Sequence, residues 1–125
     1  MQYSDETMGE DIEIGVENAQ KLVKKGREIY VFLNNYADLE FVTEVFGAKN
    51  GAKGIDTGEA MQIMLNTVDK GMAEAIGRKF DGSIIVCPHG RMSLEFASKL
   101  SGLGIRAYSL KGGIEGLKSR ALKDC

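Results

Sequence analysis

Short apolar runs alternate along this chain with segments of helical spacing, and this alternation limits the folds open to it. The clearest runs are IYVFL at residues 29–33, IIV at 84–86 and AYSL at 107–110. Runs of this kind are typical of strands buried in a parallel sheet, which need helical crossovers between them. The sequence therefore predicts an α/β fold, a small parallel sheet of four to five strands with helices on both faces.

Five segments have the periodicity and the end signals of helices. They cover residues 16–25, 38–46, 72–80, 93–101 and 114–122. Ser93 is expected to cap the fourth of them with its hydroxyl. Residues 47–58 are expected to form a loop. The run AMQIML at residues 60–65 fits a strand or a helix, and we favour a short strand.

A chain of 125 residues suits one domain. Residues 1–12 are polar, acidic and without periodicity, so we expect them to form a flexible leader and residues 13–125 to form the domain. Two cysteines and one histidine are too few for the usual zinc site or for a disulfide framework. No apolar run approaches the roughly 18 residues of a membrane span, and the first residues lack the pattern of a secretory signal. We expect a cytoplasmic protein with reduced thiols, no metal and no contact with a membrane.

The segment with the clearest chemistry follows the apolar run at 84–86. Cys87 comes directly after that run, and a short loop leads from Cys87 into a predicted helix. Ligands of parallel sheets bind at the carboxyl ends of strands. There the backbone N–H groups of such a loop point inward, and the following helix adds the positive end of its dipole. A thiol in this position is favoured as the thiolate, so we predict that Cys87 is a nucleophile inside an anion-binding loop.

The loop supplies the other predicted site residues. They are Pro88, His89, Gly90, Arg91, Met92 and Ser93. We expect Arg91 to face the substrate and Met92 to pack beneath the loop, while His89 fits a substrate contact or a position in water. The Ser93 hydroxyl can also hold a sulfur anion. Cysteine phosphatases hold phosphate with an arginine six positions after the cysteine, and that position here is Ser93, which argues against a phosphatase.

Two motifs resemble those of one known family, the rhodanese superfamily of sulfurtransferases. The first is Cys87-x-x-Gly90-x-x-Ser93 after an apolar strand, and the second is LKGGIEG at residues 110–116. The resemblance is strongest over residues 84–117. Within the family, the loop is most similar to the rhodanese domain of the tRNA 4-thiouridine and thiazole sulfur-transfer enzymes. The family's Asp-x-Arg and Gly-His-x-Pro-Gly-Ala elements are replaced by LNN at residues 33–35 and KGIDTGE at residues 53–59.

The resemblance implies a rhodanese-like fold and a sulfurtransferase activity. Cys87 would take sulfane sulfur from thiosulfate or a protein persulfide, carry it as a cysteine persulfide and pass it to a nucleophilic acceptor. The donor would be a small anion or a persulfide-bearing protein, and the acceptor a protein or a tRNA-modifying partner. The resemblance implies no cofactor and no metal. A net charge of −2 argues against a protein whose whole surface binds nucleic acid.

Two alternatives from other function classes stay open. One is a catalytically weak rhodanese-like binding module that docks a partner. The other is a thiol-based redox or arsenate-type enzyme, in which Cys125 would form a disulfide with Cys87 after the first step. The sequence also leaves the oligomeric state open.

Overall fold

The computed structural model describes residues 12–32 and 36–124, and it places side chains as far as residue 120. Its strands are β1 (Glu13–Ile14), β2 (Ile29–Val31), β3 (Lys53–Gly54), β4 (Ser83–Val86) and β5 (Ala107–Leu110). Its helices are α3 (Val16–Lys24), α4 (Tyr36–Phe46), α5 (Thr57–Met64), α6 (Lys70–Gly77), α7 (Arg91–Gly102) and α8 (Gly113–Asp124), with a short 3-10 helix at Arg78–Phe80. All five predicted helices are present.

The described strands form one sheet in the order β1-β5-β4-β2-β3, and each neighbouring pair is parallel. β4 is the central strand, with Ile85 paired to Tyr30 of β2 on one side and to Ser109 of β5 on the other. The predicted α/β fold, with a parallel sheet of four to five strands, is confirmed.

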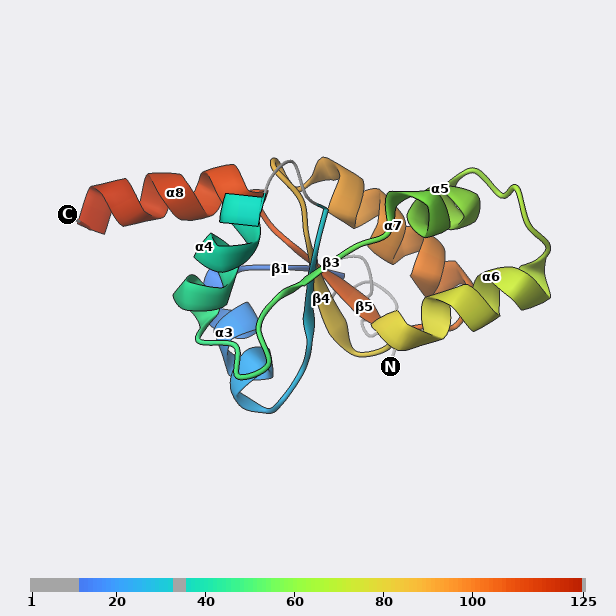
Figure 1. Ribbon diagram of the computed structural model, residues 1–125, viewed down its shortest axis with the longest axis horizontal. Helices are drawn as coiled ribbons and strands as arrows, with labels where there is room; N and C mark the ends of the chain where they lie inside the picture. The colour runs from blue at the N-terminus through green and yellow to red at the C-terminus, as the bar shows by residue number, and fades with distance from the viewer. Residues whose placement is uncertain (1–11, 33–35, 125) are drawn as a thin grey trace, which may run out of the picture.

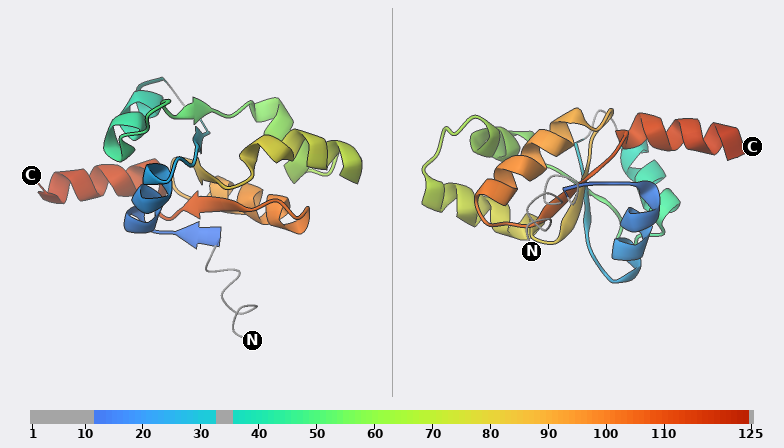
Figure 2. Two further views of the ribbon diagram at one scale, coloured as in Figure 1. Left: turned by 90° about the horizontal axis from the view of Figure 1, so that it is seen from below. Right: turned by 180° about the vertical axis from the view of Figure 1, so that it is seen from behind.

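Helices cover both faces of this sheet (Figure 1 and Figure 2). α3, α4 and α8 lie on one face, whereas α5, α6 and α7 lie on the other. The side chains of β4 alternate between the two layers, as strand geometry requires. Ile84 and Val86 belong to the core under α3, α4 and α8, whereas Ile85 belongs to the core under α5, α6 and α7. Cys87 continues the alternation and lies in the core on the α7 side.

The strand expected at residues 60–65 is wrong, because this segment belongs to helix α5. Asp56 caps α5 by accepting a hydrogen bond from the N–H of Glu59 at 3.2 Å. Ala60 and Ile63 are buried on its inner face at helical spacing. A short apolar run does not by itself distinguish a helix from a strand. In this segment the capping residue before the run decides for the helix.

The edge strands β1 and β3 lie where the sequence predicts no strand, and each has two residues. β3 lies inside the segment expected to be a loop, and it is exposed where it pairs with β2. Two residues are too few for a strand pattern to emerge from the sequence. Of the expected leader, Ile12 packs against the core on the α7 side, while residues 1–11 lie outside the described residues.

Within residues 12–32 and 36–124, no helix combines the length and the apolar character needed to cross a membrane.

The side chain of Phe96 packs α7 against the core on this face of the sheet, and its replacement tests this packing. Its fully buried ring packs edge-on against the rings of Phe32 and Phe80, with centroid distances of 5.6 and 5.0 Å. Phe96→Ala would leave a cavity there. We expect it to lower the free energy of unfolding by roughly 3–5 kcal/mol in urea denaturation.

Glu95→Ala is the matched control, because Glu95 is exposed on the same helix. Its expected effect is within about 0.5 kcal/mol. A Phe96→Ala variant as stable as this control would contradict the packing described above.

Candidate active site

Cys87 lies at the carboxyl end of the central strand, where β4 ends at Val86. Its side chain is a free thiol and is 1% exposed. Residues 88–90 form a short turn, and α7 begins at Arg91 with Gly90 as its N-cap at φ 90°. Gly90 is suited to this left-handed backbone, and it also fits closely: a Cβ there would lie 2.9 Å from the backbone nitrogen of Gly112.

The sulfur of Cys87 accepts hydrogen bonds from the start of α7. The N–H of Gly90 lies 3.1 Å from Sγ, and the N–H of Ser93 lies 3.2 Å from it. The first N–H groups of a helix have no partner within the helix, and a side-chain oxygen at the N-cap usually accepts one of them. Gly90 has no such side chain. The sulfur therefore caps α7 and lies at the positive end of the helix dipole.

Ser93 differs from its predicted role as the helix cap, because α7 begins two residues earlier at Arg91. Ser93 lies in the first turn, fully buried, and its hydroxyl oxygen is 3.3 Å from Sγ, where the thiol donates to it. On its other side the same hydroxyl lies 2.7 Å from the hydroxyl of Ser109 on β5. Ser93 therefore contacts the sulfur through both its backbone and its side chain.

Ser109 is a site residue that the sequence does not predict. It pairs with Ile85 across the β4–β5 ladder, so its side chain lies on the same face of the sheet as Cys87. It is fully buried. The signal in the sequence is weak: a single serine in an otherwise apolar run that is predicted to be a strand. Its importance follows only from the pairing of β5 with β4.

The start of α8 holds the Cys87 loop in place. The N–H of Ile114 donates to the Cys87 carbonyl at 3.0 Å, and the N–H of Glu115 donates to the Pro88 carbonyl at 2.9 Å. This approach depends on Gly113, which has φ 60°. A Cβ on Gly113 would lie 2.1 Å from the Cys87 carbonyl oxygen. The glycine pair of the LKGGIEG motif thus brings a helix N-terminus against the backbone of the loop.

The remaining predicted site residues lie toward the outside of the loop. Pro88 is half-buried, and His89 and Arg91 are exposed. The expectation that Met92 packs beneath the loop is wrong, because Met92 is 42% exposed. The early start of α7 gives the inner position to Ser93 and turns Met92 outward.

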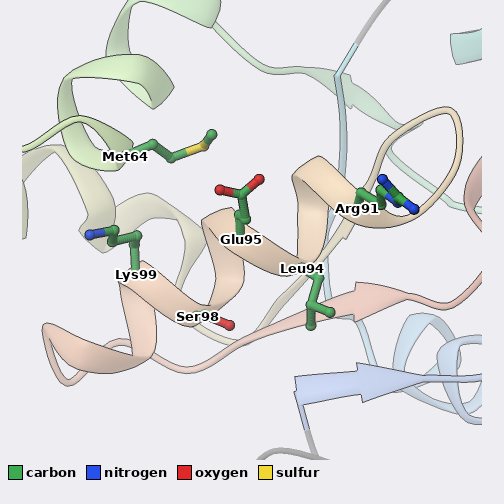
Figure 3. A pocket seen from close by; sticks show the side chains of 6 residues that line it. All are labelled: Met64, Arg91, Leu94, Glu95, Ser98 and Lys99. Carbon is green, nitrogen blue, oxygen red and sulfur yellow. The ribbon is translucent and has the colours of Figure 1, made fainter.

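Arg91 also lines an open groove of about 580 Å³ along the outer face of α7 (Figure 3). The groove is bounded by Met64, Arg91, Leu94, Glu95, Ser98 and Lys99. Cys87 is not among its lining residues, so this groove and the buried sulfur are separate features. Among the described residues, no group of three or more His, Cys, Asp and Glu side chains could hold a metal ion.

Comparison with protein-family models, with curated proteins and with solved structures found no match for this chain. The resemblance to rhodaneses therefore stays a prediction that rests on the motifs at residues 84–117.

Gly113→Ala tests whether α8 must approach the loop this closely. Both the positive φ and the contact with the Cys87 carbonyl disfavour a side chain. We expect this variant to lose at least about 2 kcal/mol of unfolding free energy in urea denaturation.

Gly116→Ala is the control on the same helix. A Cβ there meets its nearest neighbour, the carbonyl oxygen of Lys111, at an ordinary 3.8 Å. The helix propensity of alanine makes this variant as stable as the wild type or slightly more stable. If the two variants were equally stable, α8 would not be held as described.

Proposed function

We propose that this protein is a rhodanese-type sulfurtransferase that carries sulfane sulfur as a persulfide on Cys87. The observation that carries the proposal is the pair of backbone N–H groups, from Gly90 and Ser93, directed at the Cys87 sulfur at the start of α7. Donors fixed around a sulfur stabilise negative charge on it without reorganisation. Sulfur transfer needs this property because the sulfur of Cys87 is first an attacking and later a leaving thiolate.

The proposed reaction has two steps that balance without a cofactor. In the first, the Cys87 thiolate attacks the outer sulfur of thiosulfate. A new S–S bond forms, and the old one breaks with its electron pair leaving on sulfite. In the second, an acceptor nucleophile attacks the outer sulfur of the persulfide, and the electron pair of that S–S bond returns to Cys87 as thiolate. A protein persulfide can replace thiosulfate as the donor, with a thiolate leaving in place of sulfite.

The residues around the sulfur argue against a cysteine phosphatase. Six positions after Cys87 stands Ser93, whose short side chain reaches the sulfur itself. No arginine fork occupies this position to hold a phosphate from two sides. We place the reaction in the cytoplasm, where thiols stay reduced. The acceptor we propose is a protein or a tRNA-modifying partner.

The burial of Cys87 favours a second candidate, a binding module that docks a partner without turnover. Because the Cys87 thiol is 1% exposed, a sulfur donor can reach it only if the loop gives access to it. A module that only binds, however, has no chemical use for a sulfur surrounded by hydrogen-bond donors. The two candidates differ in whether Cys87 takes up sulfur.

The test is the intact mass of the protein after incubation with thiosulfate, with Cys87→Ser alongside and cyanide added afterwards. We expect the wild type to gain one sulfur atom and to lose it to cyanide, while Cys87→Ser gains none. If no adduct forms with thiosulfate, a cysteine-desulfurase persulfide is offered next. Failure with both donors would reject the sulfurtransferase and leave the binding module.

A Cys125→Ser variant in the same experiment tests the redox alternative. α8 begins against the Cys87 loop and runs for 12 residues, about 18 Å, to Asp124. Cys125 itself lies outside the described residues. We expect Cys125→Ser to take up and release sulfur like the wild type, whereas a redox enzyme with a Cys87–Cys125 disulfide would lose turnover.

Arg91 offers a second test, because it is the cationic side chain of the loop. It is exposed at the first position of α7, so its attraction to an anionic donor is screened by water and salt. We expect Arg91→Ala to raise the thiosulfate concentration for half-maximal loading roughly two- to fivefold, less at high salt. Lys99→Ala, two turns further along the same groove, is the control and should change little. Equal effects of the two variants would mean that Arg91 does not meet the donor.

A further inference from the structure

The sulfur of Cys87 is one end of a row of three buried atoms. Its Sγ lies 3.3 Å from the hydroxyl oxygen of Ser93, which lies 2.7 Å from the hydroxyl oxygen of Ser109. Cys87 is 1% exposed and both serines are 0% exposed, so the row is buried. Ser109 comes from β5, the neighbour of the strand that carries Cys87. The two hydroxyls therefore link the sulfur to the adjacent strand.

With a neutral thiol, the row has one more hydrogen than it has hydrogen bonds to form. Protonated Cys87 and two serine hydroxyls carry three hydrogens, but three atoms in a row have only two links to fill. If the extra hydrogen stays on sulfur, it faces the N–H groups of Gly90 and Ser93, which are donors themselves. If it points outward from Ser109, the hydrogen bonds of the described residues give it no acceptor. Either arrangement leaves a buried donor without a partner, which is unfavourable.

Removal of the thiol proton resolves this mismatch. The Ser109 O–H then donates to the Ser93 oxygen, and the Ser93 O–H donates to the sulfur, so that two hydrogens fill two links. The Cys87–Ser93 hydrogen bond, which the thiol donates in the structure, would then reverse. The sulfur would accept three hydrogen bonds, two from backbone N–H groups and one from the Ser93 hydroxyl. The count is the same for a persulfide, because its inner sulfur carries no hydrogen. The same hydrogen-bond arrangement therefore fits both the thiolate and the persulfide of Cys87.

We propose that Ser109 is a positioning residue for sulfur transfer, which acts through Ser93 to keep a third hydrogen-bond donor on the Cys87 sulfur. Without Ser109, the Ser93 hydroxyl is free to turn toward a backbone carbonyl one turn earlier, the usual alternative for a serine within a helix. Its role in turnover rests on the proposed function. Its effect on the charge of the sulfur rests on the geometry alone.

The experiment compares Ser109→Ala and Ser109→Thr in a Cys125→Ser background, where Cys87 is the remaining thiol. The first readout is the ultraviolet thiolate absorbance at neutral pH with no sulfur donor present, and the second is the rate of sulfur uptake from thiosulfate by intact mass. We expect Ser109→Ala to reduce the thiolate absorbance and to slow sulfur uptake about tenfold, the effect of losing a hydrogen bond to a charged group. Ser109→Thr keeps the hydroxyl, and we expect it to restore both.

A second pair of variants covers the case in which Ser109→Ala does not fold. Ser109→Thr and Ser109→Val have nearly the same shape and differ in the hydroxyl, so a difference between them reports the hydrogen bond. Equal absorbance and equal rates in this pair would overturn the role of Ser109. If the wild type takes up no sulfur from any donor, yet the thiolate absorbance still depends on the hydroxyl at 109, the proposed function and the role of Ser109 in turnover fail, while the effect of Ser109 on the charge of the sulfur stands.

Discussion

The first turn of α7 has no side-chain oxygen to cap it, because its N-cap is Gly90, and the sulfur of Cys87 accepts the N–H of Ser93 in place of one. This single contact joins the stability of a helix to the chemistry of a thiol. The N-terminus of a helix attracts negative charge, and the proposed function makes use of this property. The same hydrogen bonds therefore cap the helix and carry the proposed function.

The rest of the molecule brings this contact about. The alternation along β4 sends Cys87 to the face that α7 covers, and the buried ring of Phe96 holds α7 there. β5 lies beside β4 and brings Ser109 to the same face, and the chain then turns through a glycine pair into α8. The N-terminus of α8 donates to the loop carbonyls of Cys87 and Pro88. Two helix starts thus meet at one loop, one directed at its sulfur and the other at its backbone.

The sequence is informative where the cause is local. Local features of the sequence predict the parallel sheet and the position of the loop. They are the apolar run at 84–86, the cysteine after it and the glycines at 112 and 113. The prediction for residues 60–65 is wrong because a short apolar run fits the periodicity of a strand as well as that of a helix. The capping residue that distinguishes the two, Asp56, lies before this run. Ser93 is expected to be a cap because serine is a preferred N-cap residue, whereas here the Cys87 sulfur accepts the N–H that a cap would accept. The role of Ser109 cannot be predicted from the sequence, because its hydrogen-bond partner Ser93 lies on another element. Neither segment alone determines the register that pairs β5 with β4.

The proposal that Cys87 carries sulfur inside this loop is tested most directly by NMR. The measured quantities are the chemical shifts of the Gly90 and Ser93 amide protons during sulfur uptake. These protons point at the sulfur, whereas the amide of Gly116 donates to the carbonyl of Gly112, just before α8. After addition of thiosulfate, the resonances of Gly90 and Ser93 should move together while that of Gly116 stays, and cyanide should return them. If the protein gains a sulfur atom while both resonances remain in place, the sulfur is not carried inside this loop.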